Sequence, residues 1–352
     1  MENLLKSTKK LREGSNLSMT EAESCAHMLG WNNISDDAKV NFLEALSNKG
    51  ETAEEVSCFA RVFRALAVDP KLEDYALRGI DVCGTGGDGA GTFNMSTTVA
   101  FILAAMNIPV LKHGNRSITS NCGSADLMEA IGIKLVIDLP AHRRALKELN
   151  FSFFFAPEFH PVFKSIMPAR KILAARGKKS IFNLLGPLIN PAKPKYQLMG
   201  VYSKHWINPI AKSLSQLGLK SGMVVHGVMD KSQGLDELSC CGISHHKGFG
   251  NLDHLGGVLD IESLGLDQCQ ASELIGGSVE DNTGILMEFS KNNKAFVKTG
   301  LRNSIYLNAS AALLCLGKVS CLREGLVEAK EVVESGALLK WINRVKAFYK
   351  NV

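Results

Sequence analysis

The stretch Asp81-Val-Cys-Gly-Thr-Gly-Gly-Asp-Gly-Ala-Gly-Thr-Phe-Asn-Met-Ser-Thr-Thr98 decides how the chain is organised. Five glycines fall between Gly84 and Gly91, after a short apolar run, and the helix-like stretch Val99–Met106 follows. This order of strand, glycine turn and helix lets backbone N–H groups approach a phosphate at a helix N-terminus. A side chain would block that approach, and such turns visit positive φ, so glycine is favoured. We interpret the loop as a phosphate site, and a purely structural turn is the alternative.

The usual nucleotide-binding motifs do not fit this loop. The chain has no Gly-x-x-x-x-Gly-Lys-Ser/Thr pattern, and Asp88 stands inside the loop, where it would repel a pyrophosphate. An acid at this point suits a ligand with hydroxyl groups, or a magnesium ion beside its phosphates.

The whole chain has the length and composition of a globular protein. Its 352 residues predict two domains, or one large domain with a smaller satellite. With 45% hydrophobic and 21% charged residues it has ample core, and a net charge of +5 is too diffuse to indicate nucleic-acid binding. Nine cysteines without a CxxC spacing are typical of reduced core residues. No apolar run reaches membrane length and the N-terminus has no signal core, so we expect a cytoplasmic protein.

Residues 1–72 predict a small helical domain. Ser18-Met-Thr-Glu21 and Thr52-Ala-Glu-Glu55 are capping boxes, each opening an amphipathic stretch. Val68-Asp-Pro-Lys71 breaks the helical pattern and marks a boundary. The proline-punctuated stretch at about 160–195 is expected to be helical and to return to this domain. An apolar helical satellite of this kind is also a candidate dimer surface.

Residues 78–352 predict an α/β domain with a mostly parallel central sheet. Short unbroken apolar runs alternate with helical patterns such as Ala125–Ile131 and Asn208–Leu217, which indicates a sheet covered on both faces. Ligands of such sheets bind beyond the carboxyl ends of the strands, where the glycine loop falls. The candidate strands are Ile80–Cys83, Pro109–Lys112, Lys134–Ile137, Phe151–Phe155, Tyr196–Val201, Met223–His226 and a later one around Ala295–Lys298.

Three further stretches carry side chains suited to chemistry. Lys112–Asp126 combines cations, an imidazole, hydroxyls and glycines, a mixture that suits an anionic, polyhydroxylated ligand. Phe155–Pro161 is followed by Arg170 and then by the Phe182–Pro191 block. This stretch is either part of a binding site or only a connector stiffened by prolines. Gly234-Leu-Asp-Glu-Leu238 offers two adjacent carboxylates, which are either solvated or ligands of Mg²⁺.

Together these stretches resemble the anthranilate phosphoribosyltransferases, which belong to the nucleoside phosphorylase/phosphoribosyltransferase class (glycosyltransferase family 3). The resemblance covers nearly the whole chain, from Leu17-Ser-x-x-Glu-Ala22 and Ala45-Leu-x-x-Lys-Gly-Glu-Thr52 to Gly276–Asn282 and Leu307–Leu313. Between them GTGGD, FNxST, KHGNR, GSAD, FAPxFHP, FNLLGPLxNP and GLDE occur in the family's order. Each motif alone is moderately specific, and the ordered set is far more so.

The resemblance implies transfer of a 5-phosphoribosyl group from phosphoribosyl pyrophosphate (PRPP) to the amine of anthranilate, in tryptophan biosynthesis. It implies a Mg²⁺ cofactor, bound at Ser96, Asp236 and Glu237, and a homodimer paired through the helical domain. The residues implied for PRPP are Gly84, Gly87, Asp88, Thr92, Asn94, Ser96, Thr97, Lys112, Ser120 and Ser124. Those implied for anthranilate are Gly84, His113, Asn115, His160 and Arg170.

The chemistry agrees with these roles. Displacing pyrophosphate from ribose C1 builds oxocarbenium character, which Mg²⁺ and Lys112 favour by neutralising the leaving group. Arg170 is a natural partner for the anthranilate carboxylate, and Asn115 helps to place the amine. An aniline amine is already nucleophilic, so no residue is assigned as general acid or base.

Two segments depart from the family pattern and leave the acceptor open. The chain is about three residues longer between Arg170 and Asn183, where Lys179 replaces the family's usual Arg and where Arg176 competes for the Arg170 role. The loop Val228–Gln233 is also longer than usual. The alternatives are a related transferase with another aromatic acceptor, a nucleic-acid-binding paralogue that uses the basic run from Arg170 to Lys195, and, fitting less well, a pyrimidine nucleoside phosphorylase.

Overall fold

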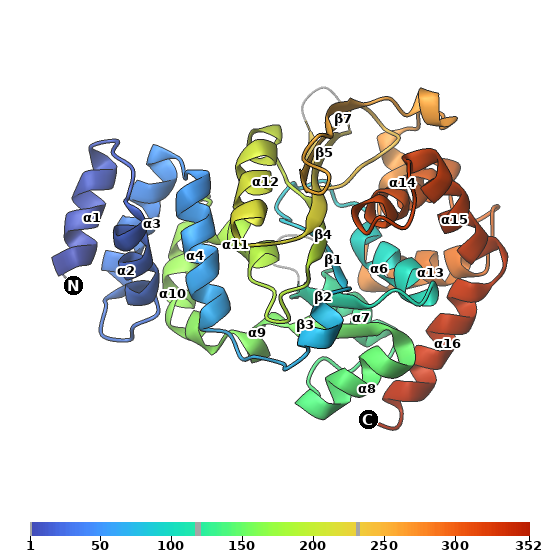
Figure 1. Ribbon diagram of the computed structural model, residues 1–352, viewed down its shortest axis with the longest axis horizontal. Helices are drawn as coiled ribbons and strands as arrows, with labels where there is room; N and C mark the ends of the chain where they lie inside the picture. The colour runs from blue at the N-terminus through green and yellow to red at the C-terminus, as the bar shows by residue number, and fades with distance from the viewer. Residues whose placement is uncertain (1, 117–120, 230–232) are drawn as a thin grey trace.

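A mixed sheet of eight strands crosses the middle of the computed structural model, which describes residues 2–116, 121–229 and 233–352 (Figure 1). The strand order is β3-β2-β1-β4-β5-β7-β8, and β6 pairs with the end of β5. β3, β2, β1, β4 and β5 are parallel, β6 and β7 each pair antiparallel with β5, and β8 pairs antiparallel with β7. The strands are β1 Ile80–Gly84, β2 Val110–Gly114, β3 Phe151–Phe155, β4 Tyr196–Gly200, β5 Ser221–Val228, β6 Gly234–Leu235, β7 Ser244–Gly250 and β8 Gly256–Leu259.

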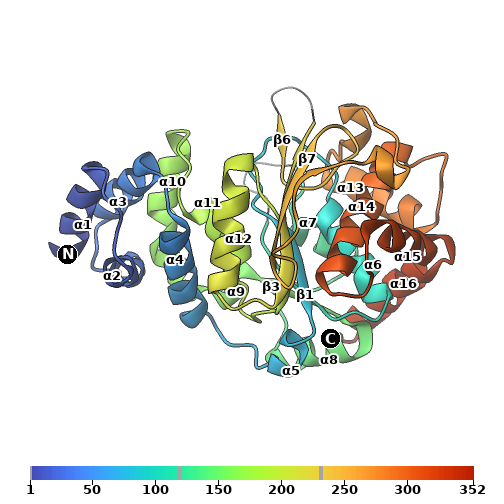
Figure 2. The ribbon, with the colours of Figure 1, turned by 45° about the horizontal axis from the view of Figure 1, so that its top comes forward.

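Helices cover both faces of this sheet. α6 and α14 pack on one face, with α15 and α16 behind them, and α12 packs on the other face (Figures 1 and 2). The helices are α1 Glu2–Arg12, α2 Met19–Leu29, α3 Asp36–Lys49, α4 Ala53–Ala65, α5 Glu73–Ala76, α6 Met95–Ala105, α7 Ser124–Ala130, α8 Leu139–Leu149, α9 Ala156–Phe159, α10 Met167–Ala175, α11 Phe182–Leu185, α12 Ile207–Gln216, α13 Val279–Ser290, α14 Thr299–Cys315, α15 Leu322–Glu334 and α16 Ala337–Tyr349.

The period of two along each strand divides the sheet residues between two cores. Val82 and Leu198 lie in the core that α6 and α14 complete. Cys83 and Met199, the next residues along the same strands, lie in the core shared with α12 and the N-terminal helices. Both faces are therefore apolar, which is why the strands read as unbroken apolar runs.

The N-terminal helices begin where the sequence predicts. Ser18 and Thr52 each accept a hydrogen bond from the backbone N–H three residues on, and Glu21 and Glu55 complete the two capping boxes. α10 packs on α3 and α11 on α4, so the later segment lies against the first helices. The buried Lys39 of α3 donates to the Ser165 carbonyl at 2.6 Å, a partly buried bond between the two segments.

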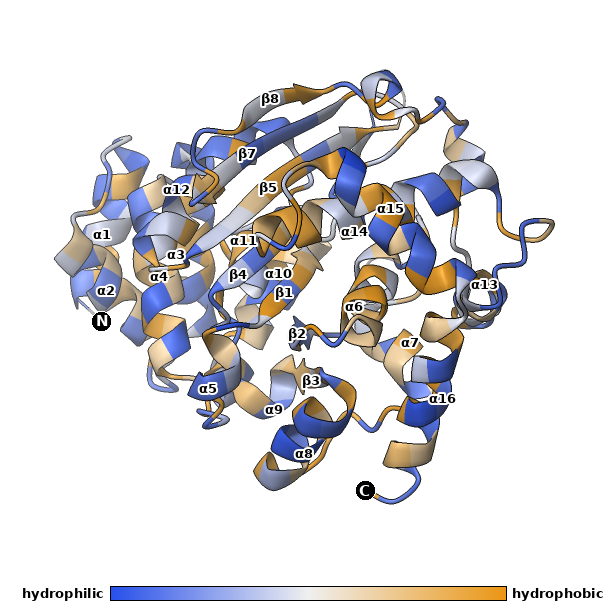
Figure 3. Cartoon of the chain, turned by 45° about the vertical axis from the view of Figure 1, so that its right-hand side comes forward, coloured by the Kyte–Doolittle hydropathy of each residue, from blue (hydrophilic) through white to orange (hydrophobic). Residues whose placement is uncertain are grey.

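The predicted fold class is confirmed, and two predicted strands are wrong. Lys134–Ile137 pairs with no described strand; its side chains alternate in exposure, and Asp138 caps α8 directly afterwards. Ala295–Lys298 forms a turn, because the Asn293 side chain accepts hydrogen bonds from the N–H groups of Ala295 and Phe296. The sequence analysis also missed β7, whose residues are largely polar, and β8, the four-residue run Gly-Gly-Val-Leu (Figure 3).

The described residues contain no helix that is long and apolar enough to cross a membrane.

Candidate functional site

The glycine loop lies against the acidic turn that follows β6. Gly86 N–H donates to Asp236 Oδ2 at 2.6 Å, and Asp236 N–H donates to Asp88 Oδ2 at 3.3 Å. Asp88 Oδ1 also accepts from Ala90 N–H at 3.1 Å. Gly86 and Gly87 have φ of +64° and +74°, a region that favours glycine. The loop thus folds against the Asp236 carboxylate, which lies 150 residues after Gly86 in the sequence.

Two strand ends make room for Asp236. A Cβ added at Gly200, the last residue of β4, would lie 1.4 Å from the Asp236 carbonyl oxygen. One added at Gly84, the last residue of β1, would lie 2.1 Å from Asp236 Oδ2. Distances this short exclude any side chain, so both glycines are required for the acidic turn to reach the carboxyl edge of the sheet.

Glu237 faces the N-terminus of α6. Its Oε1 accepts from Ser96 N–H at 3.0 Å, while its Oε2 is buried and has no hydrogen-bond partner among the residues that the structure describes. Lys112, buried in the middle of β2, donates from Nζ to the Val82 carbonyl at 2.6 Å and lies 3.5 Å from Ser96 Oγ. Ser96 therefore stands between an acid and a lysine. We refer to Asp88, Asp236 and Glu237 as the acid cluster.

Burial, and next the crowding of like charges, raises the pKa values of two carboxyls in this cluster. Burial, and next the charge of Asp88, raises the pKa of Asp236 to about 7. Burial, and then Asp236, raises the pKa of Glu237 well above its usual range. Burial lowers the pKa of Lys112, although Asp81 opposes this shift. Lys112 is therefore the cation that lies beside this group of carboxyls.

These residues fit a magnesium ion that is only partly held by protein. Glu237 Oε2 is an unused carboxylate oxygen, and the acid cluster gains from any nearby cation. Within the described ranges, no group of three or more His, Cys, Asp or Glu side chains is arranged to hold a metal by itself. Mg²⁺ typically takes one or two carboxylates and completes its shell with water and substrate phosphate, so the donor set is suitable.

Asn94 and Asn115 mark a second polar turn beside the first. Asn94 Nδ2 donates to the Cys122 carbonyl at 3.4 Å, and Ser124 Oγ donates to the Asn115 carbonyl at 3.3 Å. A Cβ at Gly114 would lie 2.3 Å from Ser124 Oγ, so this glycine permits the contact. The Asn115 side chain is exposed and accepts from Arg116 N–H at 2.8 Å.

The remaining predicted phosphate-site residues lie around the glycine loop. Thr92 forms an isolated bridge with Ile275, and the buried Thr97 hydroxyl has no partner in the described part of the chain. Gly87 and Gly84 belong to the loop and to the end of β1. Ser120 lies outside the described residues.

His113, His160 and Arg170 come together through aromatic rings. The ring centroids of His113 and His160 are 5.1 Å apart, and those of His160 and Phe163 are 5.2 Å apart. Phe163 lies 5.6 Å from Phe182, and the Arg170 guanidinium lies 5.4 Å from the Phe182 centroid. We call these five residues the aromatic cluster; it joins β2 to α10 and α11.

The aromatic cluster is neutral apart from one cation. Burial lowers the pKa of His113 to about 3 and that of His160 to about 4, so both rings are neutral near pH 7. Burial also lowers the pKa of Arg170. Among the described residues, no carboxylate pairs with Arg170, and His113 Nε2 has no hydrogen-bond partner. A cation beside aromatic rings suits an aromatic acid.

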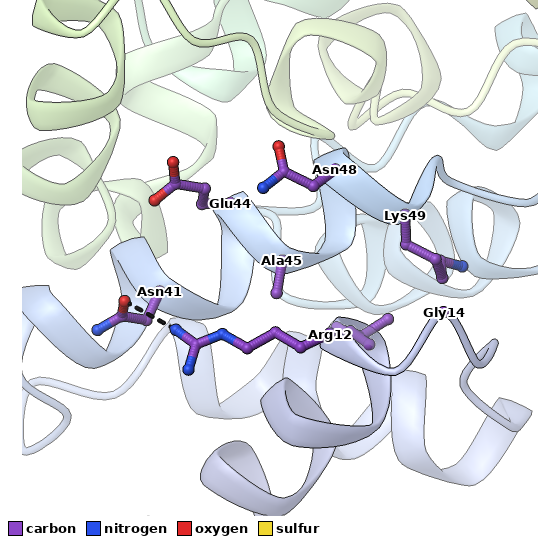
Figure 4. Close-up of a pocket in the computed structure, with 8 residues that line it drawn as sticks. Arg12, Gly14, Asn41, Glu44, Ala45, Asn48 and Lys49 are labelled. Carbon is purple, nitrogen blue, oxygen red and sulfur yellow. Dashed lines mark hydrogen bonds between the residues drawn. The ribbon is translucent and has the colours of Figure 1, made fainter.

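Arg176, the competing candidate, is engaged elsewhere. Arg176 and its neighbour Lys178 lie 3.8 Å and 2.7 Å from the Glu44 carboxylate of α3. Glu44 also lines a hollow of about 420 Å³ between α1 and α3, where Arg12 donates to Asn41 (Figure 4). None of the predicted site residues lines that hollow, so it is not where they meet.

Lys179, which the sequence analysis placed only in the basic run and not among the substrate-binding residues, contacts the glycine loop. Its Nζ donates to the Gly87 carbonyl at 3.0 Å and lies 3.5 Å from the centroid of the Tyr202 ring. It thereby connects the longer segment after α10 to the glycine loop. In the sequence, only one feature pointed to Lys179: it occupies the position at which the family usually has arginine.

Asn282 and Asn190 were missed as supporting residues. Asn282 Oδ1 accepts from Asn94 N–H at 3.0 Å and so fixes the start of α6. Asn190 Nδ2 donates to Asp81 Oδ2 at 2.8 Å and to the Leu111 carbonyl at 2.7 Å, beneath Lys112. Both asparagines stood inside motifs, but hydrogen bonds across 188 and 109 residues cannot be recognised from a single sequence.

Two family profiles match the chain. Residues 6–67 match the profile described as "Glycosyl transferase family, helical bundle domain", and residues 77–339 match "Glycosyl transferase family, a/b domain". The boundary between the two matches falls between α4 and β1.

Named relatives match over nearly their full length. An anthranilate phosphoribosyltransferase of Petrotoga mobilis is 41% identical over 96% of this chain and 95% of its own, and one of Persephonella marina is 36% identical over 97% and 98%. The crystal structure of anthranilate phosphoribosyltransferase from Thermus thermophilus has a TM-score of 0.88 and 35% identity, over 98% of this chain and 99% of that one. The Saccharomyces cerevisiae enzyme, solved in complex with PRPP and Mg, has the same fold at 24% identity and a TM-score of 0.86, over 99% and 98% of the two chains.

Proposed function

The chain belongs to the anthranilate phosphoribosyltransferase family, and from this premise we propose that it transfers the 5-phosphoribosyl group from PRPP to the amine of anthranilate. The products are N-(5-phosphoribosyl)anthranilate and pyrophosphate, and the reaction belongs to tryptophan biosynthesis. The observation that carries the proposal is the junction of the glycine loop and the acid cluster, where Gly86 N–H lies 2.6 Å from Asp236 Oδ2.

The phosphate side of the site binds PRPP and the metal. Ser96, Asp236 and Glu237 are suited to hold Mg²⁺, which when bound neutralises charge on the pyrophosphate leaving group. Lys112 supplies a second positive charge, and Asp81 and Asn190 support it from below. The loop N–H groups and the hydroxyls of the second turn orient the phosphates. The PRPP ligands are Gly84, Gly87, Asp88, Thr92, Asn94, Ser96, Thr97, Lys112, Ser120 and Ser124.

The aromatic cluster binds anthranilate. Arg170 pairs with the carboxylate, because it is a half-buried cation without a carboxylate partner in the described chain. The neutral rings of His113 and His160 lie beside the acceptor ring, and Gly84 and Asn115 border the same space from the strand ends. We propose that a carboxylate held by Arg170 would direct the amine toward ribose C1.

The reaction then depends more on the positions of the two substrates than on proton transfer by a side chain. The amine nitrogen forms a bond to C1 as the bond from C1 to the pyrophosphate oxygen breaks, and the new ammonium loses its proton. Because the aniline nitrogen is already nucleophilic, no side chain is assigned as the base. Orientation of both substrates and neutralisation of the leaving group supply the rate enhancement.

The nucleic-acid alternative finds little support in the geometry. Arg176 and Lys178 pair with Glu44, Lys179 bonds to the glycine loop, and Lys195 bonds to the Gly218 carbonyl at 3.0 Å. The basic run is therefore split among separate partners. A different aromatic acceptor remains the alternative, because the longer segments flank the site.

The division into a helical domain (1–72, with about 160–195) and an α/β domain (78–352) is part of the same proposal, as are cytoplasmic location and pairing of two copies through the helical domain. Leu5, Met19 and Trp31 support the pairing, since their exposures of 54%, 55% and 50% leave apolar surface on the first helices. Light scattering on the wild type and on Leu5→Lys/Trp31→Lys tests it; a wild-type monomer would contradict it.

The test of the reaction follows anthranilate fluorescence with PRPP and Mg²⁺, with and without EDTA. We expect metal-dependent loss of anthranilate, weaker acceptor binding for Arg170→Ala, and lost turnover for Asp236→Ala/Glu237→Ala. If anthranilate is untouched while PRPP still binds, the acceptor assignment is wrong. If neither ligand binds, the transferase assignment is wrong as well.

A further inference from the structure

We propose that Cys241 and Cys269 are a thiol modification site, at which the two side chains form a reversible disulfide. The Cys269 thiol donates a hydrogen bond to Cys241 Sγ at 3.7 Å, across 28 residues of sequence. Both side chains are half-buried, so small reagents reach them. No role was assigned to either thiol by the sequence motifs or by the transfer reaction.

The backbone holds the two thiols in register. Cys269 N–H donates to the Cys240 carbonyl at 2.9 Å, which keeps the two chain segments as close as neighbouring strands. Covalent linkage shortens the separation of the two sulfurs to about 2.0 Å. Rotation about the side-chain bonds supplies most of this change, because the backbones are already adjacent.

Both segments are anchored on the start of α14. Cys240 N–H donates to Ser304 Oγ at 3.0 Å. Cys269 packs against Gly300 so closely that a Cβ at Gly300 would lie 2.3 Å from the Cys269 Cβ. Because the backbone already holds both residues in place, forming the disulfide costs little conformational entropy in the folded protein. This favours the Cys241–Cys269 pair over other cysteine pairs.

The hydrogen bond also sets which sulfur reacts first. Burial, and next the proximity of Cys241, raises the pKa of Cys269 above the usual range of a thiol. Cys269 therefore keeps its proton and donates its hydrogen bond to Cys241 Sγ, which leaves Cys241 as the thiol that ionises first. Cys241 is the attacking thiol, and Cys269 is the resolving one.

The oxidant is a low-molecular-weight disulfide. The Cys241 thiolate attacks one of its sulfurs, forms a mixed disulfide and releases one thiolate, which takes up a proton. Cys269 then loses its proton and attacks Cys241 Sγ, and the second small thiol leaves. In total, two protein thiols become one disulfide, and the reagent gains two electrons and two protons.

Each cysteine is close in sequence to a segment that supports the phosphate site. Cys241 follows the acid cluster by four residues, and Asn308 of α14 holds the intervening Leu238 through bonds of 2.7 and 3.1 Å. Cys269 precedes Leu274, whose carbonyl accepts from Phe93 N–H at 2.8 Å at the end of the glycine loop. A disulfide would tie these two supports together. Its effect on turnover rests on the proposed function, whereas its formation does not.

The experiment incubates the full-length protein with glutathione buffers from fully reduced to fully oxidised, then alkylates remaining thiols and maps peptides by mass spectrometry. We expect a Cys241–Cys269 linked peptide with a loss of about 2 Da, which disappears after dithiothreitol. It should be absent from Cys241→Ser and Cys269→Ser, whose folding is checked by circular dichroism. It should persist in Cys321→Ser, which removes an exposed thiol.

Two outcomes would overturn the proposal. In one, the folded protein carries glutathione on Cys241 or Cys269 without an internal link. In the other, Cys269 links to Cys240, the adjacent buried thiol. Because the readout is a covalent peptide, both are distinguishable from a failure of transferase activity.

Discussion

The acid cluster and the aromatic cluster lie at the same edge of the sheet, but their buried polar groups are satisfied in different ways. In the acid cluster, carboxylates accept backbone N–H bonds of 2.6 to 3.3 Å, and one oxygen of Glu237 is left over. In the aromatic cluster, Arg170 and His113 lie among rings with almost no polar partners in the described structure.

The difference shows which charged groups of each cluster are left for a ligand to bind. The acid cluster is shaped without substrate, because the strand-end glycines and loop amides fix it. What it leaves without a hydrogen-bond partner, among the described residues, is the carboxylate oxygen Glu237 Oε2. The aromatic cluster lacks a negative partner for Arg170. Each side thus leaves a charged group for its proposed ligand, and variants of each side should fail in different ways.

The largest effect is expected from neutralising the acid cluster. Asp236→Asn/Glu237→Gln should lower kcat roughly 1,000-fold, about 4 kcal/mol, because charge on the leaving group is no longer compensated. Mg²⁺ should raise the Tm of the wild type and leave that of the variant unchanged, which thermal unfolding with and without EDTA measures. An equal metal shift in both proteins would place the metal elsewhere.

Arg170→Ala should act on the acceptor alone. Losing a charge-assisted bond to a carboxylate costs about 1.5–3 kcal/mol, so KM for anthranilate should rise roughly 10- to 100-fold. KM for PRPP should change little. Arg176→Ala is the matched control, since its guanidinium pairs with Glu44. A larger acceptor defect in the control would reassign the role.

Acid pH should lower the free energy of unfolding, because the buried His160 of the aromatic cluster resists protonation in the folded protein. His160 has a pKa of about 4 in the folded protein, against about 6.5 when unfolded. Its contribution to stability is complete above pH 6.5 and is lost as pH falls toward 4, the loss reaching about 2 kcal/mol at pH 5. Urea unfolding of His160→Gln across this range should show a flatter slope than the exposed control His205→Gln. Parallel slopes would mean that His160 is hydrated.

Lys179→Met should give the smallest effect. The Lys179 side chain is exposed, so losing its bond to the Gly87 carbonyl costs about 1 kcal/mol, and KM for PRPP should rise roughly five-fold. Lys178→Met is the control, because Lys178 pairs with Glu44 and does not contact the loop. A change in KM for anthranilate instead would make Lys179 part of the aromatic cluster.

Periodicity and motifs predicted the parallel part of the molecule well. β1, β2, β3, β4 and β5 are buried on both faces, so their residues form apolar runs that mark them in the sequence. Capping boxes were equally clear because Ser18 and Thr52 satisfy helix ends locally. Strand β7 is largely polar and β8 has only two apolar residues after two glycines, so neither forms such a run.

Contacts across long sequence separations could not be predicted. Two carboxylates in Gly234–Leu238 indicate a metal site, yet their approach to Gly86 depends on the exclusion of side chains at Gly84 and Gly200. The bond from Lys179 to Gly87 depends on where a longer segment folds back. These are properties of packing, and a single sequence carries no measure of packing.

The outer strand β8 has a consequence for the protein at high concentration. β8 has only four residues, Gly257 within it has a φ of +127°, and Lys247 lies across from Gly256 in the neighbouring strand. A short, irregular edge with a charge beside it is a poor template for another chain's backbone. Growth of the sheet into fibrils through this edge is therefore disfavoured, and the protein keeps its open strand without a covering helix.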